Sequence, residues 1–178
     1  MKSTGLSLSV LAVPLAVVVV LAPASIAQAG PSGAIFTTDE LGTFVNGNVY
    51  DDGGQVYLNG GPRPNAPCTA AGLSTGDYVF QVTDPSGAVL LSTFDDVDDR
   101  WVHVENGVID ENHGTHLEGT GPCGRTVQLW PFAPTPNPGG EYKVWMTLRS
   151  DYLIYGGFVH SKSKTDNFKV VPPGGPGD

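Results

Sequence analysis

From Thr43 onwards, apolar residues recur at every second position, and this alternation constrains the fold more than any other feature of the chain. In residues 77–83 the side chains of Tyr78, Phe80 and Val82 fall on one face, and residues 141–148 repeat the pattern. Alternate residues of an extended chain lie on the same side, so each segment predicts a β-strand with one buried face. Outside the N-terminal leader, no segment of about a dozen residues has the 3.6-residue repeat of an amphipathic helix.

Short turn sequences separate these segments, among them Asp52-Gly53-Gly54 and Asn106-Gly107. The 24 glycines and 15 prolines are typical of a turn-rich chain, because glycine tolerates positive φ and proline presets φ near −65°. Residues 101–109, which enclose Asn106-Gly107, form the clearest hairpin candidate. The other predicted strands are 44–50, 55–59, 88–92, 126–132, 154–160 and 167–171. The pattern favours an all-β fold, an immunoglobulin-like or prealbumin-like antiparallel β-sandwich, with an open barrel as the alternative.

The first 29 residues have the features of a cleavable signal peptide. Lys2 is followed by the apolar run 6–22, and Ala27-Gln28-Ala29 has the small-x-small form of a cleavage site. A membrane anchor is the alternative, but a span needs roughly 20 apolar residues. We therefore expect residues 1–29 to be removed, residues 30–171 to form one β-sandwich domain and residues 172–178 to be a disordered Pro/Gly tail. The product is expected to be a bacterial-type secreted protein, extracellular or, where an outer membrane exists, periplasmic.

Charge and cysteine content narrow the possible partners. The chain has eighteen acidic and nine basic residues, which gives a formal net charge of −9, and removal of Lys2 with the leader makes it −10. A net negative charge argues against nucleic acid as a partner. No second apolar stretch is long enough to span a membrane. Cys68 and Cys123 are the only cysteines, and export to an oxidising compartment predicts a disulfide between their two Gly/Pro-rich loops.

Two clusters of polar residues are candidate metal sites. His103, His113 and His116 could supply imidazole ligands to zinc or copper, but their spacing matches no zinc signature, which favours a polar, solvated connection between strands. The acidic run could supply oxygen ligands to calcium, although the calcium-loop motif is absent. This run consists of Asp95, Asp96, Asp98 and Asp99.

No catalytic motif is found: the chain lacks a Gly-x-Ser-x-Gly elbow and a glycine-rich phosphate loop. The tryptophans Trp101, Trp130 and Trp145 could instead stack on sugar rings or anchor a protein partner. The alternative is that neighbouring parts of the fold cover them.

Residues 56–59, 76–87 and 165–170 resemble segments of the prealbumin-like, immunoglobulin-related modules of bacterial surface proteins known as collagen-adhesin B-type repeats. This resemblance implies a non-catalytic extracellular module that spaces, stiffens or binds. Many such modules carry a Lys–Asn isopeptide bond with the lysine on an early strand. Here no lysine occurs between Gly30 and Arg125, so the bond is not expected even though Asn167 is present.

The sequence therefore predicts a secreted, non-enzymatic β-sandwich with a structural or binding role, whose partner is an extracellular protein or a glycan. The alternative is a secreted metal-binding protein or metalloenzyme built on the three histidines. No cofactor is expected in the first case, and calcium or zinc would be expected in the second.

Overall fold

The computed structural model describes residues 1, 32–45, 47, 49–62 and 65–171. The predicted leader and the predicted tail, residues 172–178, fall outside the described residues apart from Met1. The strands of the described part are β1 (Ala34–Thr38), β2 (Val49–Tyr50), β3 (Tyr57–Gly61), β4 (Gly76–Thr83), β5 (Trp101–Glu105), β6 (Val108–Asn112), β7 (Glu118–Thr120), β8 (Arg125–Gln128), β9 (Glu141–Leu148) and β10 (Ser163–Val170). One α-helix, α1 (Arg149–Tyr155), and short 3₁₀ helices at Gly53–Gln55, Val97–Asp99 and His160–Lys162 complete the described elements.

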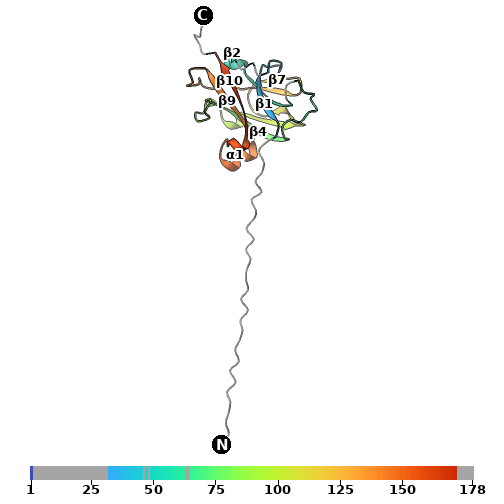
Figure 1. Ribbon diagram of the computed structural model, residues 1–178, viewed down its shortest axis with the longest axis vertical. Helices are drawn as coiled ribbons and strands as arrows, with labels where there is room; N and C mark the ends of the chain where they lie inside the picture. Colours follow the sequence, from blue (N-terminus) through green and yellow to red (C-terminus); the bar gives the residue numbers. More distant parts are fainter. Residues whose placement is uncertain (2–31, 46, 48, 63–64, 172–178) are drawn as a thin grey trace.

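Two sheets pack face to face (Figure 1). The smaller sheet has the order β1-β3-β8-β7 and the larger one β2-β10-β9-β4-β5-β6. Neighbouring strands are antiparallel except β10 and β2, which pair in parallel. The predicted all-β sandwich is therefore confirmed. No helix in the described ranges is long and apolar enough to cross a bilayer.

The core lies between the sheets, where the sequence alternation placed it. Tyr78, Phe80 and Val82 of β4 are fully buried in it, beside Val144 and Met146 of β9. The antiparallel register pairs Phe80 with Met146 and Val82 with Val144. Each such side chain contributes roughly 1.5–3 kcal/mol by leaving water, so the facing residues of these two central strands stabilise the sandwich.

The hairpin predicted at residues 101–109 is confirmed as β5 and β6. Its turn residues Asn106 and Gly107 have φ of 51° and 89°, as a tight two-residue turn of this twist requires. The backbone N–H of Leu73 donates to the carbonyl of Gly107 over 3.0 Å. The turn is therefore fastened to the β3–β4 connection as well as to its own strands.

Several strand predictions were wrong in whole or in part; β8, for example, ends at Gln128 although the prediction ran to residue 132. Residues 154–160 contain the end of α1, which stops at Gly156 in a left-handed conformation with φ of 70°. Residues 88–92 contribute only an isolated bridge from Leu90 to Thr83, and in 44–50 only β2 is a strand among the described residues. In a run this short, periodicity cannot distinguish a strand from the end of a helix. Pairing with neighbouring strands in the fold therefore decides which structure forms. β1 and β7 were not predicted.

Candidate functional site

The outer face of the smaller sheet carries two large side chains that are nevertheless covered. Phe36 of β1 and Asn59 of β3 are paired across the strands, and both point away from the core that contains Ile35 and Leu58. Each retains less than a tenth of its exposed surface, 7% for Phe36 and 9% for Asn59. An outward-facing pair this buried needs a cover from outside the sheet.

Two loops and a hairpin turn provide that cover and leave a groove of about 820 Å³ between them. Phe36, Asn59 and Val108 form its floor, and its described walls come from residues 42–45, 62, 65–68 and 122–123. Most of the contacting side chains are apolar, prolines included. None of the described lining residues has an ionisable side chain, and the Asn59 amide is among the few polar groups.

The first wall is held in place by Asp39. Its carboxylate accepts hydrogen bonds from the backbone N–H of Thr43 and Phe44, at 2.7 and 3.0 Å, and from the Thr43 hydroxyl at 2.8 Å. Burial raises the pKa of Asp39, but these hydrogen bonds outweigh it, so the pKa lies below the ordinary value of 3.8. The Thr126 hydroxyl on β8 also donates to the carbonyl of Glu40, over 2.5 Å, which ties this loop to the sheet.

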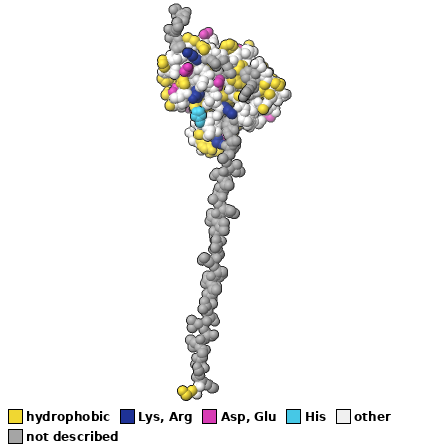
Figure 2. Space-filling view, viewed as in Figure 1, with side chains coloured by type: hydrophobic (Ala, Val, Ile, Leu, Met, Phe, Trp, Pro, Cys, Tyr) yellow, Lys and Arg dark blue, Asp and Glu magenta, His cyan; other side chains and the backbone are white. Residues whose placement is uncertain are grey.

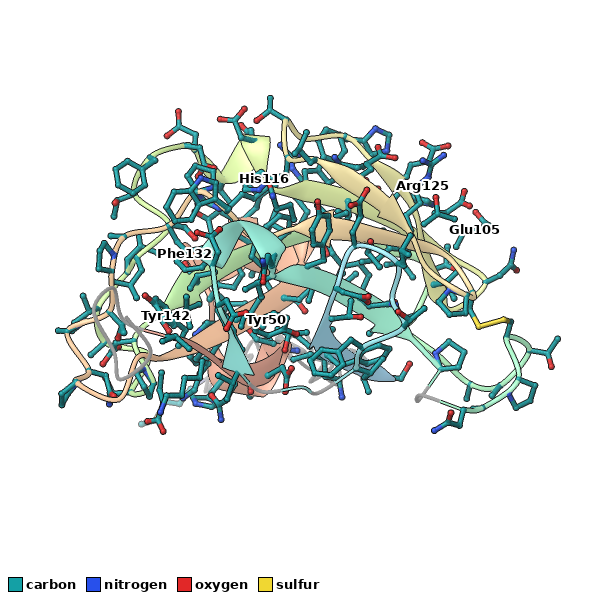
Figure 3. All side chains as sticks on the ribbon, turned by 90° about the horizontal axis from the view of Figure 1, so that it is seen from above. Tyr50, Glu105, His116, Arg125, Phe132 and Tyr142 are labelled. Atoms are coloured by element: carbon teal, nitrogen blue, oxygen red, sulfur yellow. A yellow bond between two sulfur atoms is a disulfide. The ribbon has the colours of Figure 1, made fainter. Side chains whose placement is uncertain are left out.

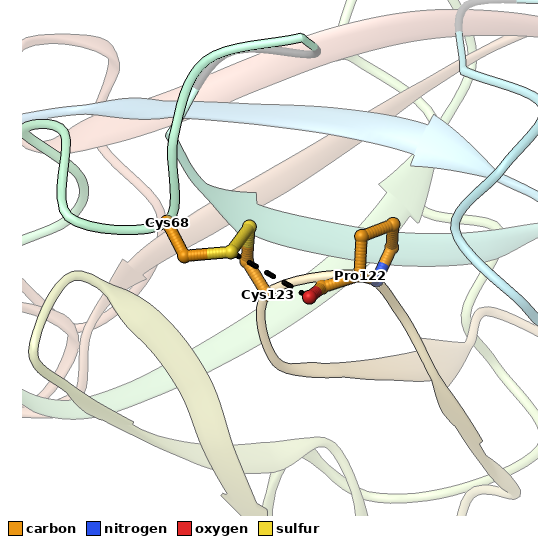
Figure 4. The surroundings of a disulfide bond; sticks show 3 residues. All are labelled: Cys68, Pro122 and Cys123. Atoms are coloured by element: carbon orange, nitrogen blue, oxygen red, sulfur yellow. Dashed lines mark hydrogen bonds between the residues drawn. A yellow bond between two sulfur atoms is a disulfide. The ribbon is translucent and has the colours of Figure 1, made fainter.

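The predicted disulfide is confirmed and fastens the second wall. Cys68 in the β3–β4 connection is bonded to Cys123 in the β7–β8 turn, with 5.2 Å between the two Cα atoms (Figure 4). The sulfur of Cys68 lies 3.5 Å from the carbonyl oxygen of Pro122. Both cysteines line the groove, so the bridge sets the spacing of two of its three walls.

Of the three histidines considered as a metal site, His116, which is labelled in Figure 3, is buried and hydrogen-bonded within the chain. Its Nε2 is 2.8 Å from the carboxylate of Asp95 and its Nδ1 is 2.7 Å from the carbonyl of Gln128. Both ring nitrogens are therefore occupied by contacts within the chain in this arrangement. The His116 ring also packs edge-on against Phe80, with 5.2 Å between the ring centroids.

Asp95 belongs to the same buried network. Its carboxylate forms an ion pair with Arg100, and the two side chains are only 11% and 5% exposed. Arg100 also donates from Nε to the carbonyl of Phe80 and from Nη1 to that of Asp95, both over 3.0 Å. Asp95 is therefore a structural counter-ion here, surrounded by donors from its own chain.

The other aspartates of the acidic run have separate partners. Asp98 pairs with Arg149 over 2.7 Å, and Asp99 accepts from the Thr115 hydroxyl and from the backbone N–H of Asp96, each over 3.2 Å. Within the described ranges, no group of three or more His, Cys, Asp or Glu side chains is arranged to hold a metal ion.

His103 and His113 do come together, on the surface of the β5–β6 hairpin. Their ring centroids are 6.4 Å apart, and each ring has a carboxylate neighbour. His103 Nδ1 is 2.7 Å from Asp77 on β4, and His113 Nε2 is 3.3 Å from Glu111. The pair is a partly exposed, hydrogen-bonded cluster, of which His116 is not a member.

We expect the His103–Asp77 contact to appear in the pH titration of His103. The hydrogen bond to Asp77 raises the pKa of His103 above 6.5, with a further contribution from Glu105. Because the folded-state pKa is raised, the contact stabilises the fold fully below pH 6.5 and loses its effect as pH rises through that pKa. NMR titration of the imidazole protons should show Asp77→Asn lowering the pKa of His103 and Glu141→Gln leaving it in place. Equal pKa values in the Asp77 variant and the wild type would contradict this contact.

The three tryptophans differ in exposure. Trp145 is 5% exposed, donates from Nε1 to the Thr83 hydroxyl over 2.9 Å and packs against His160. Trp101 is half-buried, with the Arg149 guanidinium and the His113 ring each 4.7 Å from its ring. Trp130 is 46% exposed. One of the three predicted binding tryptophans thus presents a largely open ring.

Sequence reasoning identified the cysteines of the groove but missed the groove itself. The available signal was the proline and glycine content of 61–67 and 121–124, which marked loops without showing that they meet. Comparison with models of known protein families, with curated proteins and with solved structures finds no match.

Proposed function

We propose that this chain is a secreted, non-enzymatic β-sandwich module that binds an extracellular protein through the groove beside the disulfide. The observation that carries the proposal is the groove itself: about 820 Å³, mostly apolar, with the Asn59 amide at its floor. Its volume lies in the range of ligand sites, and an apolar hollow with few polar groups is the usual form of such sites.

A segment of a protein suits this groove better than a sugar does. Prolines and valines in the lining suit the apolar side chains of a partner, and the Asn59 amide has both donor and acceptor groups, as a peptide group does. A sugar site would need open aromatic rings, and Trp145 and Trp101 are covered by other groups. Trp130 is the remaining platform for the glycan alternative.

Two observations support an extracellular location. The Cys68–Cys123 bridge is typical of proteins that fold in an oxidising compartment, and the leader predicts export to one. The walls that the bridge and Asp39 hold in place would keep the groove formed before its partner arrives, which reduces the ordering cost of binding.

Selection from a random peptide library on the immobilised protein tests the proposal. We expect enrichment of peptides rich in apolar side chains, and we expect Val108→Trp, which fills the floor, to weaken their binding by about tenfold or more. Asn59→Ala provides a second groove variant. Val89→Trp is the matched control, because Val89 is exposed and lies outside the groove lining.

Peptides that bind the Val108→Trp and Asn59→Ala proteins as well as the wild type would overturn the groove assignment. Binding on a glycan array that disappears in Trp130→Ala would transfer the binding role to sugars. Stoichiometric metal in protein purified without chelator, lost in His103→Ala, would favour the metal-binding alternative.

A further inference from the structure

Part of the second wall of the groove is a short segment between β3 and β4, residues 65–71, which we name the strap. It supplies Asn65, Ala66, Pro67 and Cys68 to the groove lining. None of its residues is buried, and Cys68 itself is exposed. The strap therefore lies at the surface, and its position depends on the contacts that hold it there.

The disulfide is the main tie between the strap and the rest of the fold. Among the described residues, the strap takes part in one backbone hydrogen bond, from the N–H of Ala70 to the carbonyl of Pro67 over 2.8 Å, and both of these residues belong to the strap. Its other polar contact joins the Cys68 sulfur to the carbonyl of Pro122, beside the bridge (Figure 4). Without the bond to Cys123, this weak sulfur contact is the one polar interaction left between the strap and the other described residues.

The structure on both sides of the bridge is fastened independently of the disulfide. After the strap, Leu73 packs in the core, and its N–H donates to the carbonyl of Gly107 over 3.0 Å. On the other side of the bridge the β7–β8 turn closes on itself, because the N–H of Gly121 donates to the carbonyl of Gly124 over 2.8 Å. Opening of the bridge would therefore release the strap while the neighbouring strands and the turn stay paired.

We infer that the disulfide is a redox switch for the groove, whose reduction frees the strap and weakens binding of the partner. This inference rests on the proposed function, since it names the regulation of the same groove. The direction follows from the ordering cost of binding. A released strap must be fixed again when the partner binds, and that cost is subtracted from the affinity.

The reductant that the switch requires is a dithiol. One of its thiolates attacks the sulfur of Cys68, the more exposed of the two cysteines, which forms a mixed disulfide and releases Cys123 as a thiolate. The second thiol of the reductant then displaces Cys68. The reductant leaves as a disulfide, and its two protons and two electrons pass to the two cysteines. Reoxidation reverses these steps and closes the wall again.

Peptide binding and hydrogen exchange, measured before and after treatment with dithiothreitol, test the inference. The probes are the peptides selected on the oxidised protein. We expect reduction to weaken their binding about tenfold or more at a temperature where the protein is still folded. In the same samples, amide exchange should become faster in residues 65–71 and stay slow in β4. Reoxidation should restore the original affinity.

Two variants provide the controls. Cys68→Ser/Cys123→Ser should bind the peptides weakly from the start and should not respond to dithiothreitol. Hydrophobic side chains also gather at the end of the molecule where Figure 1 places α1 (Figure 2). Ile154 of α1 is 72% exposed and lies outside the groove lining, so Ile154→Asp should leave both the affinity and its response to dithiothreitol unchanged.

Equal peptide affinities of the oxidised and reduced protein would overturn the switch, and a loss of binding in Val108→Trp would at the same time leave the proposed function standing. Exchange that becomes equally fast in β4 would also overturn it, because the disulfide would then support the whole fold and not the strap in particular. Peptide binding that is lost in Ile154→Asp and kept in Val108→Trp would overturn the proposed function itself, and with it the role of the switch in binding.

Discussion

Replacing Asp95 with alanine is expected to lower the free energy of unfolding by about 3–5 kcal/mol, as measured by urea denaturation. The substitution leaves the Arg100 guanidinium, whose side chain is 5% exposed, without its counter-ion. It also removes the acceptor for Nε2 of His116, whose side chain is 1% exposed. The Arg100 charge would then stay buried without a counter-ion and His116 would lose one buried hydrogen-bond partner, and each such loss costs far more than a surface contact contributes.

Asp98→Ala provides a control within the same acidic run. The Asp98 side chain is 72% exposed and pairs with Arg149, so its loss should change the free energy of unfolding by less than about 1 kcal/mol. Similar losses in the two variants would show that the buried network does not stabilise the fold as described. Calcium that stabilises the wild type and neither variant would revive the interpretation of this run as a calcium site.

The double variant Cys68→Ser/Cys123→Ser is expected to lose about 4 kcal/mol of the free energy of unfolding. The bridge joins residues 55 positions apart, and the loop-entropy relation gives this value for a closed loop of that length. Urea denaturation of the oxidised wild type, the reduced wild type and the double variant measures the effect. The last two should agree, because each lacks the covalent loop.

The same variant tests the binding role separately from stability. Both cysteines line the groove, so peptides selected on the oxidised protein should bind the double variant more weakly at temperatures where it is still folded. The Asp95→Ala protein is the comparison, since it is destabilised to a similar extent and its substitution lies outside the groove lining. Equal losses of peptide binding in the two variants would indicate an effect of stability alone.

The central strands could be predicted because one face of each is uniformly apolar in the sequence. Tyr78, Phe80 and Val82 alternate with residues of the other face, and the period of two identifies such a strand without knowledge of its neighbours. The Asn106-Gly107 turn was predictable for a similar local reason, since both residues accept positive φ.

β1 escaped prediction because both of its faces are covered. Ile35 faces the core, Phe36 lies beneath the loops of the groove, and Ile35 through Thr38 are all buried, so no alternation develops. α1 escaped for a different reason. Its seven residues are too few for a helical repeat, and it is positioned by contacts such as that between Arg149 and Trp101.

The candidate site depended still more on tertiary structure. Its described walls come from residues 42–45, 62, 65–68 and 122–123, and nothing in the sequence relates these segments beyond the two cysteines. The three histidines show the opposite case, because the fold places His113 and His116, which are close in sequence, in different surroundings. His113 lies on the surface beside His103, whereas His116 turns inward to Asp95.

The sequence by itself determined the class of fold, the central strands and the cysteine pairing, because periodicity, turn chemistry and an even pair of thiols act locally or by count. Only the tertiary structure decided what each polar group does. Four neighbouring aspartates look alike in the sequence, yet Asp95 is a buried counter-ion and Asp98 an exposed one. Burial and the identity of a partner are set by chain segments that meet only on folding, and the groove arises in the same way.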